Sequence, residues 1–280
     1  MSSLARLNRW LHISVYCAAL ATTGCAAAGR AKAVRSVERG QTALASHDLD
    51  EAKTQFARAA SSDPKSAAAQ AGLGRVYAAR RALDKAADHF RQAMKLDPQT
   101  ASHCIGLGDV LLQQAQTSME RGKVLALAIR AYRHGLSLDA KAYDAAMGLA
   151  ACYRLTGDYD RAIRSTRQAQ RINPMSAEPH IVLAGVYEAQ NDMRKAMRAY
   201  RMALRLAPDD SAIHNACGAL NVRLTQRGGA EARIARQRAC AHFRKSLQMQ
   251  PNQPQIRRLL AGLEQQEDTL FWAATDDSGD

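Results

Sequence analysis

The sequence has few of the residues that build β-sheets. Of its 280 residues only 5% are aromatic and 7 are proline, and Val, Ile and Thr never form alternating runs. Half-buried strands are rich in β-branched and aromatic residues at alternate positions, so this composition argues against a sheet protein. Ala, Leu, Arg, Gln and Met, most of them strong helix formers, dominate instead. The sequence therefore predicts an all-α fold.

Patterns typical of catalysis and metal binding are missing as well. No Cys or His spacing fits a metal site, and the 8 histidines are scattered without a nucleophile or a base beside them. The stretches AGLGR and IGLGD look like phosphate-binding loops, but both fall inside helical stretches where glycine serves close packing. We expect no catalytic residue, no metal, no cofactor and no small-molecule substrate, and hence no enzyme.

Positive charge is in excess. The 39 Lys and Arg outnumber the 26 Asp and Glu, which gives a formal net charge of +13. A chain of this kind attracts anionic partners, and nucleic acid is the first to consider. Where the charges lie in the fold decides between such partners.

A period of 34 residues runs through the chain, from Pro64 to Pro98 and again from Pro174 to Pro208. Within it the same small and aromatic residues return at the same spacing. One unit carries Leu73, Gly74, Tyr77, Ala86, Phe90, Ala93 and Pro98, and another carries Leu183, Ala184, Tyr187, Ala196, Tyr200, Ala203 and Pro208. This pattern resembles the tetratricopeptide repeat (TPR) family.

The resemblance implies a right-handed superhelical solenoid of six helix-turn-helix repeats with a concave and a convex side. The small residues let two helices approach closely, and proline ends the second one. A capping helix over 254–272 and an acidic tail over 273–280 follow the last repeat. We place the repeats at 33–66, 67–100, 101–142, 143–176, 177–210 and 211–253.

The third and sixth repeats are longer than the others. Gly108 and Ala128 stand 20 residues apart, whereas Gly74 and Ala86 stand 12 apart, and the sixth repeat shows the same expansion. Blocks 33–142 and 143–253 therefore have the same organisation, which indicates duplication of a three-repeat block. The inserted stretches, 116–127 and 223–237, are either tolerated turns or ridges on which a partner docks.

Residues 1–24 differ from everything that follows. Two positive charges precede a mostly apolar run, residues 11–21, which is too short for a normal membrane-spanning helix of about 20 residues. This arrangement predicts a secretion signal. The step ATTGC after it resembles the cleavage box of bacterial lipoproteins, which implies lipidation of Cys25 and a tether over 25–32. An ordinary signal peptide and an uncleaved amphipathic leader are the alternatives.

The resemblance places partner binding in the concave groove, which the first helices of the repeats line. The groove residues are Val37, Gln41, Arg75, Ile105, Asp109, Met147, Arg154, Ile181, Glu188 and Asn215. Some family members clamp a C-terminal carboxylate with paired Lys and Asn, and that constellation is missing here. A protein partner that offers an apolar helix or extended segment fits better, with the charged groove residues setting its polarity and register.

Eleven basic residues recur at equivalent positions of the second helices, three or four residues apart, so they share one helix face. This basic stripe consists of Arg91, Lys95, Arg130, Arg133, Arg164, Arg167, Arg171, Arg198, Arg201, Arg205 and Arg244. The opposite face holds the packing residues, so we expect the stripe on the convex side. It is either a solvated face or a contact with an anionic membrane surface, where each Lys or Arg can contribute on the order of 1 kcal/mol. Nucleic acid fits less well, because no aromatic residues are interleaved to stack on bases.

Cys104, Cys152, Cys217 and Cys240 occupy helical positions where a small core residue is expected. A disulfide between Cys217 and Cys240 is open at this stage, since both belong to the sixth repeat.

These observations predict a non-catalytic protein-interaction scaffold, exported and anchored as a lipoprotein on the periplasmic face of a bacterial cell envelope. It resembles the repeat lipoproteins that assist the assembly of pili, secretion systems or export complexes. The alternatives are a soluble cytoplasmic adaptor and a regulatory subunit of a transferase encoded elsewhere.

Overall fold

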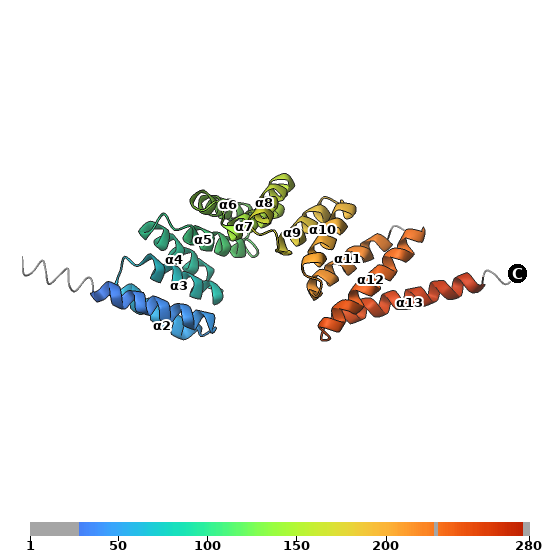
Figure 1. Ribbon diagram of the computed structural model, residues 1–280, viewed down its shortest axis with the longest axis horizontal. Coiled ribbons are helices and arrows are strands. Elements are labelled where there is room, and N and C mark those ends of the chain that lie inside the picture. Colours follow the sequence, from blue (N-terminus) through green and yellow to red (C-terminus); the bar gives the residue numbers. More distant parts are fainter. Residues whose placement is uncertain (1–27, 227–228, 277–280) are drawn as a thin grey trace, which may run out of the picture. The chain divides into compact units, whose positions relative to one another are not determined.

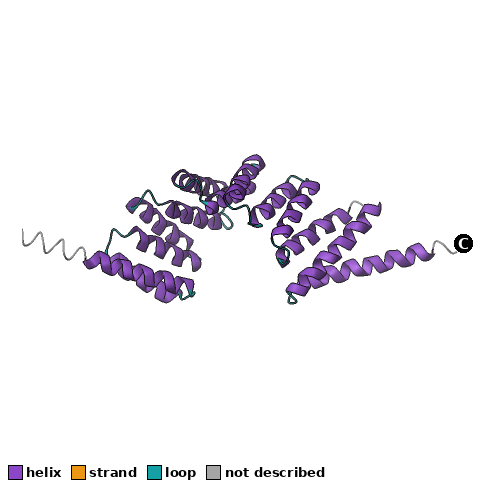
Figure 2. Ribbon diagram, viewed as in Figure 1, coloured by secondary structure: helices purple, strands orange, loops and turns teal. Residues whose placement is uncertain are grey.

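The computed structural model describes residues 28–226 and 229–276, with side chains described over 28–226 and 231–265. Within these ranges the chain consists of helices and short turns, without a strand (Figure 2). The all-α class predicted from composition is thereby confirmed. The predicted signal peptide over 1–24 and the predicted lipidation site, Cys25, lie outside the described residues, as do residues 277–280 of the acidic tail.

The helices follow one another as antiparallel pairs in two compact units, Met1–Cys152 and Tyr153–Asp280 (Figure 1). The first unit contains a helix over residues 28–45, α2 (Leu49–Ser62), α3 (Ala67–Ala79), α4 (Leu83–Leu96), α5 (Ala101–Gln114) and α6 (Arg121–Leu138). The helix α7 (Tyr143–Thr156) runs across the boundary. The second unit continues with α8 (Tyr159–Ile172), α9 (Glu178–Ala189), α10 (Met193–Leu206), α11 (Ser211–Thr225), α12 (Gly229–Met249) and α13 (Pro254–Asp276).

Contacts join each helix pair to the next pair along the chain. In the first unit α3 packs on α4 and α5 on α6, while α2 contacts α3 and α4 contacts α5. In the second unit α9 packs on α10 and α11 on α12, and contacts of α8 with α9 and of α10 with α11 connect successive pairs. Such nearest-neighbour stacking is the organisation of a repeat solenoid.

Two boundaries differ from those expected from the sequence. Residues 28–32, which we expected in the tether, are helical, because Ala, Arg and Lys favour helices. Gly29 lies so close to the carbonyl oxygen of Ser62 that a Cβ there would stand 2.8 Å from it, so this end of the helix packs against α2. At the other end, the capping helix extends to Asp276, and Leu263 packs against Phe243 on α12.

One aromatic ring fills the centre of each helix pair in the first unit. Phe56 on α2, Phe90 on α4 and Tyr132 on α6 are at most 3% exposed. Truncating a buried ring of this kind to alanine typically costs about 3–5 kcal/mol. Each ring lies against one glycine of the helix before it and one of the helix after it, and a Cβ at either glycine would overlap the ring. The glycine pairs are Gly40 and Gly72 for Phe56, Gly74 and Gly106 for Phe90, and Gly108 and Gly148 for Tyr132.

The turn between the two helices of a repeat comes in two forms. Four repeats use a residue in the left-handed region, with φ between 60° and 79°, at His47, Arg81, Gly157 and Asn191. The third and sixth repeats contain the inserted residues instead. Their second helices, α6 and α12, have 18 and 21 residues, whereas α4 and α10 have 14 each. The insertions therefore lengthen mainly the second helix of the pair.

The four cysteines of the described chain are buried, as expected for core residues. Burial raises the pKa of the Cys152 and Cys217 thiols to about 12, so both stay protonated at neutral pH. Cys217 forms no disulfide in the described part of the chain, so the bridge to Cys240 that the sequence left open is not formed.

Two histidines of the sixth repeat share a hydrogen bond between α11 and α12. Nδ1 of His214 lies 3.0 Å from Nδ1 of His242, and Nε2 of His214 lies 3.0 Å from the carbonyl oxygen of Pro208. A carbonyl only accepts, so Nε2 of His214 carries the proton and its Nδ1 accepts from Nδ1–H of His242. Burial, together with the neighbouring His214, lowers the pKa of His242.

The glycine contacts can be tested with Gly106→Ala. The added methyl group overlaps the Phe90 ring, so we expect a loss of about 1–3 kcal/mol in the free energy of unfolding, which exceeds the gain in helix propensity of about 1 kcal/mol. Urea denaturation followed by circular dichroism measures it. Gly122→Ala on α6 is the matched control, since nothing lies within 4 Å of a Cβ there, and it should not destabilise. Equal effects of the two substitutions would contradict the close-packing role.

The histidines predict a dependence of stability on pH. Burial lowers the pKa values of His89, His180 and His242, so below about pH 6.5 the unfolded chain binds protons that the fold resists. The free energy of unfolding should therefore fall as the pH drops from about 7 to about 5. His242→Gln keeps an N–H donor toward His214 and should reduce this loss, whereas an unchanged pH profile would show that His242 plays no part in it.

Candidate functional site

The first unit has a groove cavity of about 370 Å³ between its first helices α3, α5 and α7. It contains three of the predicted groove residues, Arg75 on α3 and Ile105 and Asp109 on α5. These helices bring them together because the residues occupy corresponding turns of neighbouring repeats. The remaining lining residues are Ala71, Ala78, Phe90, Ser102, Gly106, Val110, Gln113 and Asp144. The cavity thus joins an apolar centre to charged and amide side chains.

Asp109 connects this cavity to the core of its repeat. The hydroxyl of Tyr132 donates a hydrogen bond to its carboxylate at 2.7 Å. Asp109 remains open to solvent on the groove side, but the protein around it and the nearby Asp144 raise the pKa of its carboxyl, while the bond from Tyr132 acts in the opposite direction. Burial, with the Asp109 charge next, raises the pKa of Tyr132, so the tyrosine stays protonated as the donor.

Three other groove residues of the first unit lie elsewhere. Val37 and Met147 are each 8% exposed and belong to the packed interior, so they offer little surface to a partner. Gln41 is exposed on the helix over residues 28–45 but does not line the cavity.

In the second unit the predicted groove residues are bound largely to their own chain. Glu188 accepts a hydrogen bond from Tyr200 at 2.6 Å and forms an ion pair with Arg223 at 2.6 Å, which leaves its side chain 14% exposed. The amide of Asn215 donates to Oε1 of Gln253 at 2.7 Å. Glu188 and Asn215 therefore connect helices of this unit.

The remaining predicted groove residues of the second unit keep some exposure. Ile181 is half-buried on α9, and Arg154 is exposed on α7 with its side chain beside Gly185.

All eleven residues of the basic stripe are exposed, as expected for a face turned away from the packing residues. Four belong to the first unit and seven to the second. Among the described residues only two members form an ion pair, Arg91 with Asp88 at 2.8 Å and Arg244 with Glu264 at 2.6 Å. The other members keep their charge free for an external anion.

Within residues 28–226 and 229–276 no group of His, Cys, Asp and Glu side chains is placed to hold a metal ion. In the same part of the chain no helix is long and apolar enough to cross a membrane.

Sequence reasoning missed three polar residues of the groove cavity, Ser102, Gln113 and Asp144. Ser102 stands three residues before Ile105, and Gln113 four after Asp109, so helical spacing alone could have found both. Asp144 comes from the first turn of the next repeat, and no local spacing relates it to α5.

Asp109→Asn should raise the thermal midpoint at pH 7 by a few degrees at most. Folding raises the pKa of Asp109, so its ionised form is disfavoured in the fold, and asparagine removes the charge while it keeps an oxygen acceptor for Tyr132. The gain should vanish near pH 3, where both carboxyl forms are neutral. Thermal melts at both pH values measure it, and a gain that persists in acid would contradict this account.

The comparisons with known proteins agree with the observed arrangement. Models described as tetratricopeptide repeat match residues 37–101, 112–177 and 154–220. Among curated proteins none matches the sequence significantly.

Several solved structures share the fold. The chain is similar to PilW, a widely conserved type IV pilus biogenesis factor, with a TM-score of 0.68 at 16% identity over 81% of this chain and 98% of that one. PilF of Pseudomonas aeruginosa gives 0.65 at 16% identity over 84% and 99%. A chain of the APC/C hetero-tetramer Cut9–Hcn1 gives 0.65 at 20% identity over 83% of this chain, which spans only 43% of that one. The repeat-model matches and the stacked helix pairs together show that this chain belongs to the tetratricopeptide repeat family.

Proposed function

We propose that the protein is an interaction scaffold, anchored in a bacterial cell envelope, that binds a segment of a protein partner in the groove cavity of its first unit. The observation that supports this most is the arrangement of Arg75, Ile105 and Asp109 around one cavity. Tetratricopeptide repeat proteins are in general non-catalytic scaffolds that bind protein partners.

The chemistry of the cavity suits a segment with an apolar residue between two charges of opposite sign. Ile105 offers an apolar contact, and Arg75 forms no ion pair within the described chain, so its guanidinium is available to a carboxylate. Asp109 and Asp144 can accept from a basic side chain or from backbone N–H groups. Because the two signs of charge come from different helices, they impose a direction on the bound segment.

The envelope location and the assembly role rest on two supports. The chain covers 98% and 99% of two pilus proteins, PilW and PilF, with the same fold. The step before Cys25 has the small residues of a lipoprotein cleavage box. Together they favour a lipoprotein that assists assembly of a pilus, a secretion system or an export complex. The basic stripe supplies a second membrane signal, and two signals anchor stably where one lipid chain binds weakly.

The test uses the full chain expressed in a bacterial host with an envelope, followed by fractionation and intact-mass measurement. The wild type should reach the membrane fraction with lipid mass on Cys25, and Cys25→Ser should lose that mass and most of the membrane association. Washing with about 1 M salt should weaken the residual binding of the variant, since salt screens the basic stripe. An unmodified wild-type chain in the cytosol would refute the anchor and leave the groove proposal standing.

The groove is tested in the same cells by chemical crosslinking and co-purification. Arg75→Glu reverses a charge of the cavity and should remove the partner that the wild type captures. Arg58→Glu reverses an exposed charge on α2 outside the cavity, so it should retain that partner. Loss of the partner in both variants, or in neither, would refute binding in the groove cavity.

A further inference from the structure

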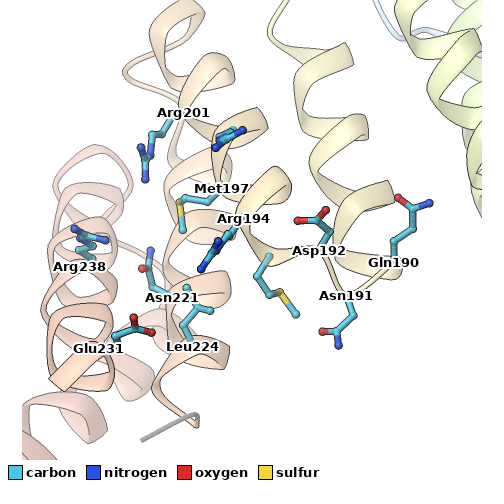
Figure 3. A pocket seen from close by; sticks show the side chains of 12 residues that line it. Gln190, Asn191, Asp192, Arg194, Met197, Arg201, Asn221, Leu224, Glu231 and Arg238 are labelled. Carbon is cyan, nitrogen blue, oxygen red and sulfur yellow. The ribbon is translucent and has the colours of Figure 1, made fainter. Parts of the chain in front are cut away.

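Two arginines of the basic stripe line a second cavity, which lies in the second unit. Its volume is about 750 Å³, and it opens between α10 and α12 above the end of α11 (Figure 3). This side of the helix pairs is opposite to the first helices that line a groove. The arginines that border the cavity are Arg194, Arg198, Arg201 and Arg238.

No carboxylate of the described residues forms an ion pair with any of these four arginines. Asp192 borders the same cavity, but it already pairs with Lys195 at 2.8 Å and accepts from the Lys195 backbone N–H at 3.0 Å. Glu231 is the second carboxylate of the lining. The cavity therefore has a positive surplus that the fold itself does not neutralise.

A buried acceptor lies at the floor of this cavity. The amide nitrogen of Asn221 on α11 donates to the carbonyl of Cys217 at 2.9 Å, which orients the side chain. Its Oδ1 has no hydrogen-bond partner among the described residues, and the residue is 1% exposed. Figure 3 shows Asn221 beside the long side chains of Arg194 and Met197, whose rotation can open a path to it. An unpaired buried acceptor destabilises the fold, and a donor delivered through the cavity removes that cost.

The first unit contains the counterpart of this cavity between α4 and α6. The internal duplication relates the two, because positions 110 residues apart correspond before the insertion and positions 111 apart correspond after it. The chemistry has changed at four lining positions. The corresponding pairs are Asp84 and Arg194, Asp88 and Arg198, Leu111 and Asn221, and Leu127 and Arg238.

The earlier cavity satisfies its own charges, unlike the later one. Asp88 pairs with Arg91 at 2.8 Å, and Asp84 accepts from the amide of Gln114 at 2.7 Å. The position of the unpaired Asn221 is filled by the apolar Leu111. The positive surplus and the free acceptor are therefore specific to the cavity of the second unit and not a general property of the lengthened repeats.

These features select one class of occupant. The arginines call for carboxylates, while Met193, Met197 and Leu224 offer apolar surface beside them. Oδ1 of Asn221 needs an N–H or O–H donor, which a peptide backbone supplies. A phosphate dianion offers acceptors alone and would face Asn221, Asp192 and Glu231 unfavourably.

We propose that the cavity between α10 and α12 binds an acidic peptide segment that carries apolar residues, with carboxylates on the four arginines and a backbone N–H on Asn221. This site is separate from the groove cavity of the first unit, so it stands or falls independently of the function proposed for that groove.

The probe is a phage-displayed library of short random peptides, selected on the purified full chain and followed by fluorescence anisotropy of the enriched peptides. We expect enrichment of Asp and Glu together with apolar residues. Arg194→Asp combined with Arg198→Asp, which installs the residue types of the first unit, should weaken binding by at least about tenfold. Asn221→Leu, again taken from the first unit, should weaken binding several-fold and raise the thermal midpoint.

The matched control is Arg164→Asp combined with Arg167→Asp, which makes the same change in net charge on exposed arginines of α8 outside the cavity. It should bind the selected peptides within about threefold of the wild type. Equal loss in both double variants would reduce the effect to general charge attraction and overturn the site. Selection without acidic peptides, or displacement of them by millimolar inorganic phosphate, would overturn the proposed occupant.

Discussion

An aromatic ring held between glycines of two successive repeats is the contact on which the first unit depends. Phe56, Phe90 and Tyr132 each lie where neither neighbouring helix can carry a Cβ, so the helices approach more closely than ordinary side chains allow. One ring thereby fixes both the geometry within a pair and the attachment of the next pair. The groove cavity inherits this order, since Phe90 and Gly106 form part of its wall and hold Ile105 and Asp109 in place.

The fold was predictable from the sequence because its determinants are local and recur. The spacing of Leu, Gly, Tyr, Ala and Pro within one period reports the packing of one helix pair, and stacking repeats it. For the same reason Arg75, Ile105 and Asp109, which occupy corresponding repeat positions, were expected together and lie together. Residues 28–32 were less predictable, because a stretch of small and helix-forming residues can read as a tether until its packing against Ser62 is known.

The partners of polar side chains could not be derived in this way. Glu188 and Asn215 occupy groove positions, but Arg223 and Gln253 bind them from a distance in sequence at which no repeat spacing relates the residues. The cavity of the second unit went unseen for a similar reason, since the insertion breaks the register that aligns the repeats. Both candidate sites nevertheless share a property. Asp109 keeps a carboxyl whose ionisation the fold disfavours, and Asn221 keeps an acceptor that the fold leaves unpaired.

The position of the rings also gives the molecule a direction of assembly. A ring on a second helix is covered by a glycine that precedes it and by another that follows, so a nascent chain emerging from the ribosome always ends in a half-covered aromatic side chain. Each newly synthesised repeat closes the one before it. The series ends at Phe243, for which no further repeat exists and which α13 covers through Leu263. Translation that stops before α13 would therefore release a nearly complete molecule with an adhesive end, a feature that molecular chaperones can recognise.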